Sequence, residues 1–410
     1  MSDADPQQFD IVVIGGSVAG SAVAATLSDE GYSVALIERE AAFRDRARGE
    51  GIHPWGMDEA EELGLLELLR AGGAHPLPVW LTYVDRVPVE PLLMAEHSAR
   101  GHVEQGVFHP TLQETMLVYA REHRVSVYRP ASLVALDRRD DRVFVGVEQD
   151  GETISLAAQI VIGADGTHSK TRSQVGIATE KDVLHHWFAG VLIDGFGGDP
   201  DAAHSSLVAG GRFFILPQGN GRARAYLALM PVRIAAIQAD RSGRALLQLI
   251  AEYLPDGMLA DAEPAGPQGI FSNADIWPET AAADRIVLIG DAAGTNDPSV
   301  GNGIAMALRD VRELRDAIRE SGLTQTALEL YALRRARYYG ALRQYASWMG
   351  EIWLEEGPEA DAKRVRFRTA REMDPDAGGF NMITMLGPRD LVPTEAARAR
   401  FFGEAAPTPG

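Results

Sequence analysis

The chain has 410 residues, of which 46% are hydrophobic and 24% charged, as in ordinary globular proteins. This length allows two or three packed units. Acidic residues outnumber basic ones by 58 to 39, and the net charge of −19 argues against a nucleic-acid-binding surface. Because the chain has no cysteine, disulfides, thiolate metal sites and thiol chemistry are excluded.

The first ten residues are acidic and lack the basic and apolar regions of a secretory signal peptide. No uninterrupted apolar run reaches the length that spans a membrane. We therefore expect a cytoplasmic protein that binds neither membranes nor nucleic acid. The sequence leaves the oligomeric state open.

A strand, a glycine-rich turn and a helix are predicted between Asp10 and Leu27. Residues 11–14 are all apolar, as in a parallel strand that is buried on both faces. The turn GGSVAG then precedes a helix whose free N–H groups favour a pyrophosphate. Ser17 stands where the dinucleotide fingerprint has its second glycine, and its hydroxyl can donate to a phosphate. The turn residues expected to bind this cofactor are Gly15, Gly16, Ser17, Ala19 and Gly20.

A second apolar strand is predicted over residues 34–37, and it ends at Glu38. This acid follows Gly20 by eighteen residues, a position from which a carboxylate accepts hydrogen bonds from an adenosine ribose. The two elements together predict a bound dinucleotide. Basic residues come next, and they can reach the phosphates of such a cofactor or lie in solvent as surface arginines. They are Arg39, Arg44, Arg46 and Arg48.

The following stretch is predicted to mix helices and strands. One helix is expected over residues 57–66, with a glycine near its middle, and strands over 79–89. A second helix is expected over 111–123, where its first residue and Glu114 form a capping box. Strands between 125 and 162 are expected to form a small antiparallel meander that returns to the main sheet.

A second strand that ends in a glycine turn is predicted at residues 159–166. Asp165 and Gly166 lie at its carboxyl end, where open α/β sheets hold ligands, although a plain strand end gives the same pattern. Residues 178–280 then change character. Strands are expected at 184–193, 205–216 and 222–232, and a helix at 244–253, which indicates an α+β domain that forms one wall of a cavity.

A third glycine turn follows the apolar strand at residues 285–289. A helix that starts near Ile304 has apolar residues at spacings of three and four, and its N-terminus is expected to point at a ligand. Residues 324–373 are expected to be helical, with Trp348 and Trp353 in packing roles, and the tail is expected to be loosely held at its end. The third set of cofactor candidates is Gly290, Asp291, Pro298, Gly301, Asn302 and Gly303.

The three turns GGSVAG, GADGTHSKTR and GDAAGTNDPSVGNG, in this order, resemble the FAD-binding domain of the single-component (group A) FAD-dependent monooxygenases, the family of p-hydroxybenzoate hydroxylase. The resemblance covers about residues 9–340. It implies an α/β fold: a GR2-type Rossmann-like FAD-binding domain with a mainly parallel sheet and a β-meander, an α+β substrate domain and C-terminal helices. The expected divisions are 1–177 (FAD-binding, with 79–110 on the substrate side), 178–280 (substrate-binding), 281–340 (FAD-binding return) and 341–410 (C-terminal helices and tail).

The resemblance also implies residue roles. Gly15, Gly20 and Glu38 would hold the adenosine diphosphate half of FAD, and Arg48 would lie along the cofactor. Asp165 and Gly166 would serve both FAD and the nicotinamide cofactor. Asp291 would bind the ribityl hydroxyls, and Gly301 to Gly303 would face the pyrimidine edge of the flavin. Two residues depart from the family pattern, namely His109, where an arginine is common, and Gly294, where a histidine is common.

By this resemblance the protein would be an FAD-dependent monooxygenase. It would use NAD(P)H and molecular oxygen to hydroxylate or epoxidise a small aromatic or polycyclic substrate through a flavin hydroperoxide. No cue decides between NADPH and NADH, although basic residues favour NADPH. These residues are Arg44, Arg46, Lys170 and Arg172.

The sequence also leaves other functions open. One alternative is a halogenase, although the W-x-W-x-I-P string of such enzymes is absent; others are a reductase of isoprenoid double bonds and a non-catalytic flavin-binding module. The catalytic side chains stay unknown. Candidates for a base that acts on a phenol are His53, His185 and Tyr226, each of which can instead be an ordinary hydrogen-bonded residue. The ten histidines show no metal-binding spacing, so no metal site is expected.

Overall fold

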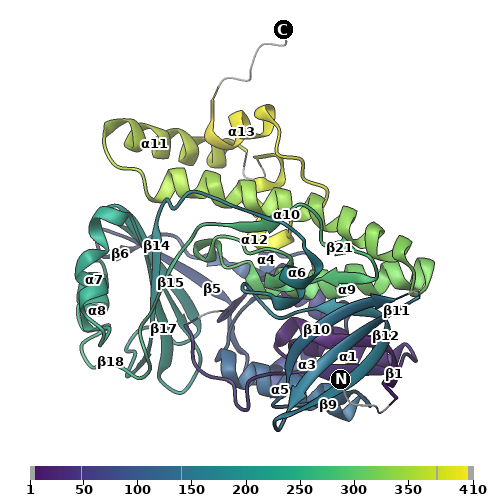
Figure 1. The fold of residues 1–410 in the computed structure, drawn as a ribbon. Coiled ribbons are helices and arrows are strands. Elements are labelled where there is room, and N and C mark those ends of the chain that lie inside the picture. Colours follow the sequence, from purple (N-terminus) through teal and green to yellow (C-terminus); the bar gives the residue numbers. More distant parts are fainter. Residues whose placement is uncertain (1–4, 48, 140, 375–376, 405–410) are drawn as a thin grey trace.

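The computed structural model describes residues 5–47, 49–139, 141–374 and 377–404. Arg48, one of the predicted cofactor residues, lies outside the described residues. Figure 1 shows two sheets side by side beneath a layer of C-terminal helices.

The first sheet contains the parallel strands that carry the three predicted turns. Their spatial order is β9 (Ser126–Tyr128), β2 (Val34–Ile37), β1 (Gln7–Ile14), β12 (Glu152–Gly163) and β22 (Ile286–Leu288). The long strand β12 also pairs with β11 (Arg142–Gln149), which pairs with β10 (Ser132–Arg139), and these three strands form the predicted meander.

Side-chain alternation along β1 explains why this strand is apolar throughout. Ile11 and Val13 pack among the helices α1 (Val18–Asp29), α5 (His109–Glu122) and α9 (Gly303–Ser321). Val12 and Ile14 point the other way and pack against the meander. Both faces of the strand are therefore removed from water, as expected for a parallel strand.

The second sheet forms the opposite side of the molecule. Its order is β18 (Glu263–Pro264), β14 (Trp187–Asp194), β17 (Arg222–Leu229), β16 (Gly211–Pro217), β15 (Ala202–Val208), β5 (Val79–Val84) and β6 (Val87–Pro88). Two more strands pair at its margin, namely β7 (Leu92–Leu93) with β5 and β19 (Gly269–Ser272) with β14. Helices α7 (Ala235–Ala239) and α8 (Arg244–Ala251) cover its outer face, and its other face contributes Phe188 and Tyr226 to a separate apolar cluster.

Helix α10 (Gln325–Trp353) runs across both sheets, and α11 (Pro358–Met373) and α13 (Glu395–Phe402) pack above it (Figure 1). Trp348 fills the space between these helices, with its ring centroid 5.2 Å from that of Phe401 and 4.8 Å from that of Phe380. The predicted α/β class with a parallel sheet, a meander and C-terminal helices is therefore confirmed.

Short elements complete the chain. The remaining helices are α2 (Pro54–Glu62), α3 (Leu66–Ala71), α4 (Met94–His97), α6 (Lys170–Val175) and α12 (Ile383–Leu386), with 3-10 turns at Pro231–Arg233, Gly290–Ala293, Pro298–Val300 and Ala377–Met382. The remaining strands are β3 (Gly51–Ile52), β4 (His75–Leu77), β8 (Glu104–Gly106), β13 (Thr179–Lys181), β20 (Ile276–Pro278) and β21 (Ala282–Ala283).

Some local predictions were wrong. The single helix expected over 57–66 is divided into α2 and α3, because Gly64 takes a left-handed φ of +70°. The expected capping box does not form: Phe108 is the N-cap of α5, and the Glu114 carboxylate pairs with Arg129 instead. Trp353 has the packing role that was expected, and it lines the central cavity as well.

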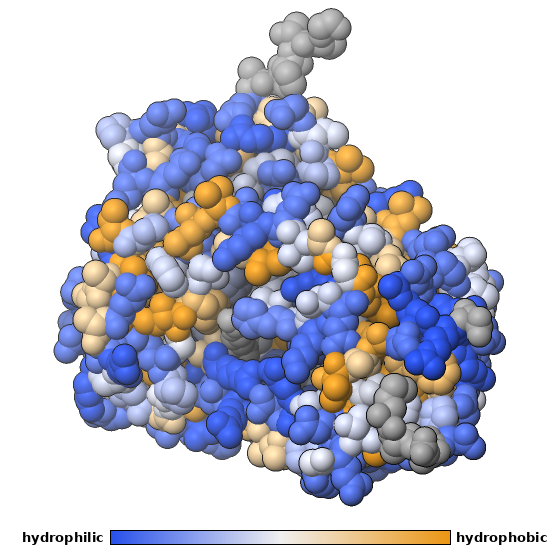
Figure 2. All heavy atoms as spheres, viewed as in Figure 1, coloured by the Kyte–Doolittle hydropathy of each residue, from blue (hydrophilic) through white to orange (hydrophobic). Residues whose placement is uncertain are grey.

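Figure 2 shows that hydrophilic side chains cover most of one face of the molecule. Within the described part of the chain, no helix has both the length and the apolar character needed to cross a bilayer.

Candidate functional site

One cavity of about 2050 Å³ lies between the two sheets and the helices above them. This is larger than the roughly 300–1,000 Å³ of a typical small-molecule pocket, so it has room for a dinucleotide and a second molecule. Most of the predicted cofactor residues line it: Gly15, Ser17, Ala19, Glu38, Arg39, Asp165, Gly166, Gly290, Asp291, Pro298, Gly301 and Gly303. Three others do not line it: Gly16, Gly20 and Asn302.

The first turn needs its glycines for packing. Gly15 has a φ of +104°, and a Cβ on it would lie 2.3 Å from the carbonyl oxygen of Ala164. A Cβ on Gly20 would lie 1.8 Å from the carbonyl oxygen of Gly15. Strand β1 and helix α1 therefore approach so closely that the first turn of α1 opens onto the cavity, where its N–H groups and dipole favour an anion. At the same turn, Gln113 Nε2 donates to Ser17 Oγ at 2.8 Å.

Glu38 ends β2 at the cavity wall. Its carboxylate accepts hydrogen bonds from the backbone N–H groups of Gly16 and Glu40, each at 2.7 Å. The side chain is 5% exposed and still lines the cavity. These bonds fix the carboxylate where the sequence predicts contact with a ribose.

The second and third turns are joined by their acidic residues. The Asp165 carboxylate accepts from Ser169 Oγ and from the backbone N–H of Thr171 at 2.9 Å, which fixes the start of α6. Thr167 Oγ1 donates to Asp291 Oδ2 at 3.2 Å. The two turns are therefore held side by side at the carboxyl ends of β12 and β22.

His53 supports the loop that precedes α9. Its Nδ1 lies 2.6 Å from Glu104 Oε2, and its Nε2 lies 2.8 Å from the carbonyl oxygen of Val300. A carboxylate and a carbonyl oxygen are both acceptors, so this arrangement favours the protonated imidazole. Burial alone would lower the pKa of His53, but the Glu104 carboxylate outweighs it and raises the pKa. Next to it, Trp55 Nε1 donates to Asn302 Oδ1 at 3.4 Å.

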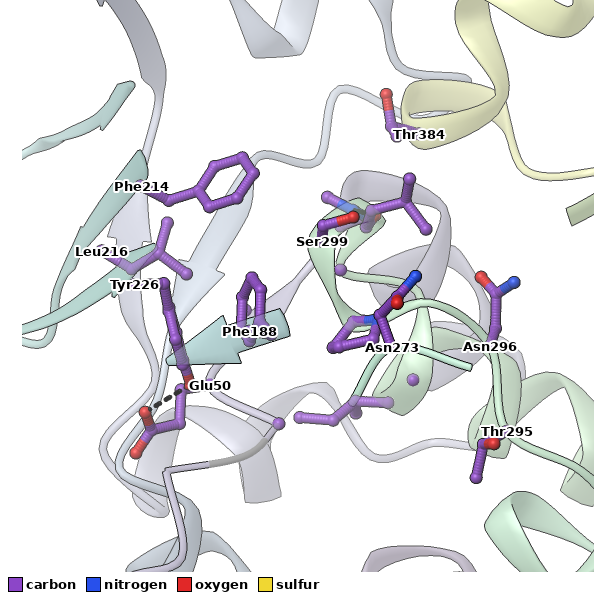
Figure 3. Close-up of a pocket in the computed structure, with 18 of the residues that line it drawn as sticks. Glu50, Phe188, Phe214, Leu216, Tyr226, Asn273, Thr295, Asn296, Ser299 and Thr384 are labelled. Atoms are coloured by element: carbon purple, nitrogen blue, oxygen red, sulfur yellow. Dashed lines mark hydrogen bonds between the residues drawn. The ribbon is translucent and has the colours of Figure 1, made fainter. Parts of the chain in front are cut away.

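Tyr226 lies on the opposite wall, where Figure 3 shows it with Phe188, Phe214 and Leu216 across the cavity from Ser299 and Asn296. Its O–H donates to Glu50 Oε2 at 2.8 Å, and burial raises the pKa of Tyr226 well above its ordinary value. The phenol therefore stays protonated. The same carboxylate pairs with Arg224, which also pairs with Asp45 at 2.7 Å.

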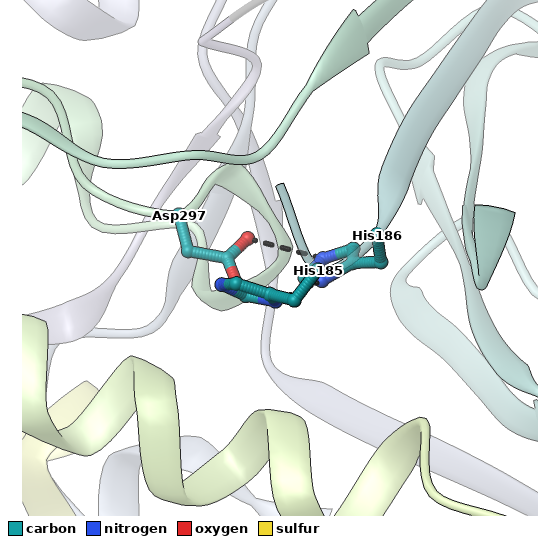
Figure 4. A group of neighbouring side chains, drawn as sticks. All are labelled: His185, His186 and Asp297. Carbon is teal, nitrogen blue, oxygen red and sulfur yellow. Dashed lines mark hydrogen bonds and ion pairs between the residues drawn. The ribbon is translucent and has the colours of Figure 1, made fainter. Parts of the chain in front are cut away.

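His185 does not line the cavity. Figure 4 shows it beside His186 and Asp297, and a ligand atom of each lies within 4.8 Å of the others, so this group can hold a metal ion. The group also has hydrogen-bonding partners without one. The two histidines approach at 2.8 Å through their Nδ1 atoms, and Asn273 Nδ2 donates to Asp297 Oδ2 at 3.2 Å.

The departures from the family pattern lie next to the same site. His109 contacts the carbonyl oxygen of Gly49 through Nδ1 at 2.8 Å, and burial lowers the pKa of His109 to about 4, so it is neutral. Of the basic residues that favour NADPH, Arg44, Arg46 and Lys170 line the cavity. Arg172 instead donates to the carbonyl oxygens of Thr167 and Ala292, each at 2.8 Å.

Comparison with known proteins gives the family. A model of the FAD-binding domain family matches residues 8–336. The chain belongs to this family. The chain is 24% identical to squalene monooxygenase from Mus musculus over 319 residues. The aligned region covers 76% of this chain and 55% of the relative, so the chain spans about half of that enzyme's length. It is 28% identical to digeranylgeranylglycerophospholipid reductase 2 from Methanopyrus kandleri over 374 residues, 86% of this chain and 88% of the relative.

Among solved structures, p-nitrophenol 4-monooxygenase PnpA from Pseudomonas putida has the same fold, with a TM-score of 0.76 and 18% identity over 92% of this chain and 99% of that chain. The family match therefore confirms the FAD-binding domain that the resemblance implied, and this solved structure shows the same fold.

The residues of the site fit FAD. Gly15 and Gly20 allow the close packing of the first turn, two helix N-termini open onto the cavity, and the Glu38 carboxylate is fixed at the end of β2. A dinucleotide needs these features for its pyrophosphate and ribose. Sequence reasoning missed the supporting partners Glu104 and Glu50, because neither belongs to a motif.

Proposed function

We propose that the protein is a monooxygenase that uses FAD, NAD(P)H and molecular oxygen to hydroxylate or epoxidise a small aromatic or polycyclic substrate. The observation that carries this proposal is the continuity of one cavity from the three glycine turns to the aromatic wall formed by Phe188, Phe214 and Tyr226. Bound FAD supplies hydride acceptance and oxygen activation.

In this proposal the three turns hold the cofactor along its length. Gly15, Ser17 and Glu38 would hold its adenosine diphosphate half, and Asp291 would hold its ribityl chain. The loop that ends at Gly303 would serve the flavin end, where the N-terminus of α9 would stabilise negative charge by about 0.3–2 kcal/mol. His53 adds its positive charge behind that loop.

The aromatic wall orients the substrate and keeps water from the reacting atoms. Tyr226 is a positioning residue in this scheme, because its proton is committed to Glu50. No base for the substrate is assigned. Among the reductants, the three arginine and lysine side chains in the cavity favour NADPH over NADH.

The test uses purified protein reconstituted with FAD and a library of aromatic compounds. We expect a yellow protein that oxidises NADPH faster when a substrate is present, with one atom of ¹⁸O₂ appearing in the product. Coupled NADPH oxidation that never places labelled oxygen in any product would refute oxygen insertion.

A reductase of isoprenoid double bonds is the second candidate, because the relative from Methanopyrus kandleri is a digeranylgeranylglycerophospholipid reductase that aligns over 88% of its length. Such an enzyme would consume reductant without oxygen. Turnover with an unsaturated isoprenoid under strict anaerobiosis, giving a saturated product, would establish this candidate instead.

A further inference from the structure

Arg212 projects from β16 into the cavity among aromatic rings. The central carbon of its guanidinium lies 4.1 Å from the ring centroid of Trp353 and 4.5 Å from that of Phe214. The ring of Trp80 is 5.8 Å away. These rings come from α10, β16 and β5, and cation–π contact with several faces fixes the guanidinium plane.

This arginine has no anionic partner. Among the described residues, no carboxylate oxygen lies within 4.0 Å of an Arg212 nitrogen, and its one polar contact is with Ser205 Oγ at 3.3 Å. The buried arginines Arg224 and Arg335 differ in this respect, because Arg224 pairs with Glu50 and Arg335 pairs with Asp310 at 3.1 Å.

Arg212 is partly buried in the cavity wall. Arginine stays charged at neutral pH, and a charge that is partly removed from water is stabilised by an anionic partner. Burial lowers the pKa of Arg212 to about 10, which still leaves it protonated near pH 7. Its free N–H groups form a planar fork that matches a carboxylate.

The surroundings add basic and apolar side chains. Arg368 and Arg371 line the same cavity from α11, as does Asp361, and neither arginine forms an ion pair with a described carboxylate. Met349 and Ile352 of α10 line it as well. The region therefore suits a planar apolar molecule with a negative end.

We propose that Arg212 binds an acidic group of the substrate, a carboxylate or another planar oxyanion, and that the substrate class is aromatic acids rather than neutral aromatics. The aromatic body would lie against Phe214 and Trp353 with its acidic end on the guanidinium. The identity of the bound molecule as a substrate rests on the proposed function; the binding itself does not.

The experiment measures binding to the FAD-loaded protein by isothermal titration calorimetry with matched probes, 2-naphthoate against 2-naphthamide and benzoate against benzamide. We expect each acid to bind at least about tenfold more tightly than its amide, the size of effect that a charge-assisted bidentate contact gives. Arg212→Gln should reduce this preference to less than about threefold, and Arg212→Lys should retain part of it because the charge remains.

The matched control is Arg139→Gln. Arg139 also stacks on an aromatic ring, at 5.1 Å from the Phe144 centroid, but it lies on the meander and outside the cavity. This variant should keep the full acid preference. Circular dichroism and flavin content will show that each variant is folded, and the comparison of acid with amide on the unaltered protein needs no variant.

Equal affinity of the unaltered protein for acid and amide would overturn the proposal, as would an acid preference that survives Arg212→Gln or that is lost only in Arg371→Gln. The two proposals fail separately. Arg212-dependent acid binding without oxygen insertion would reject the monooxygenase, whereas oxygen insertion into neutral aromatics alone would reject the role of Arg212.

Discussion

At the scale of single residues, the buried ionisable side chains around the cavity mostly hold backbone in place. His53 bridges Glu104 and the carbonyl of Val300, and Tyr226 donates to Glu50. A side chain whose protons are committed in this way is poorly suited to act as a base. We therefore regard His53 and Tyr226 as positioning residues, and His185 lies behind the lining residue Asn273 rather than in the lining itself.

Replacing His53 with glutamine should destabilise the protein in a pH-dependent way. Because the folded-state pKa of His53 is raised, its contribution is fully present below its unfolded value near 6.5 and is lost as the pH rises through the folded value. We expect a loss of about 3–5 kcal/mol at low pH that shrinks at high pH. Urea unfolding at about pH 5.5 and pH 9 measures it. His123→Gln, which breaks a partly exposed pair with Asp29, should cost about 1 kcal/mol or less.

Asp275 gives a second pH-dependent prediction. Burial, together with the nearby Asp297 charge, raises the pKa of Asp275 to about 8. The folded state therefore loses stability as the pH rises from about 4 towards 8, by at most about 1.4 kcal/mol per pH unit. Asp275→Asn removes this loss, so the stability of the variant relative to the unaltered protein should grow between pH 5 and pH 8 in urea unfolding. A difference that is constant with pH would contradict the assignment.

At the scale of elements, the first strand–turn–helix is so closely packed that a side chain at Gly15 or Gly20 would clash with backbone atoms. Gly20→Ala would place a methyl group 1.8 Å from the carbonyl oxygen of Gly15. We expect α1 to shift, a loss of about 1–3 kcal/mol or more, and a clear fall in bound flavin. Thermal unfolding and the flavin absorbance of the purified protein measure both. Gly340→Ala in α10, where a Cβ would meet nothing within 4 Å, should keep or raise stability.

The elements that could be predicted from the sequence carry local signals. The apolar strand over 11–14, the glycine turns and the helix that starts at Gly303 depend on spacing within about twenty residues. The pairs His53–Glu104 and Glu50–Arg224 join residues far apart in the chain, and no motif marks them. The cavity-lining role of Trp353 was missed for the same reason, because only the contact between α10 and the second sheet brings it to the cavity.

At the scale of the whole molecule, Arg224 links the second sheet to the loop between β2 and β3. It lies on β17 and pairs with Glu50 and Asp45, which precede β3 on the cofactor side. Arg224→Met leaves the buried Glu50 and the partly buried Asp45 without their cation, and we expect a loss of about 3–5 kcal/mol. Arg222→Met on the same strand breaks only an exposed pair with Asp194 and should cost about 1 kcal/mol or less. Urea unfolding compares the two variants, and adding Glu50→Gln to Arg224→Met should recover part of the loss.

The length of α10 limits where residues can be inserted into this chain. Near its start, Tyr331 donates to the carbonyl of Leu288 at 3.0 Å, and its last residue is Trp353 beside Arg212. An α-helix turns by about 100° per residue. One residue inserted after Gly340 would keep Tyr331 in place but rotate Trp353 by about 100° around the helix axis, away from Arg212. Insertions between these two anchors are therefore tolerated only when they preserve the rotational phase of the helix.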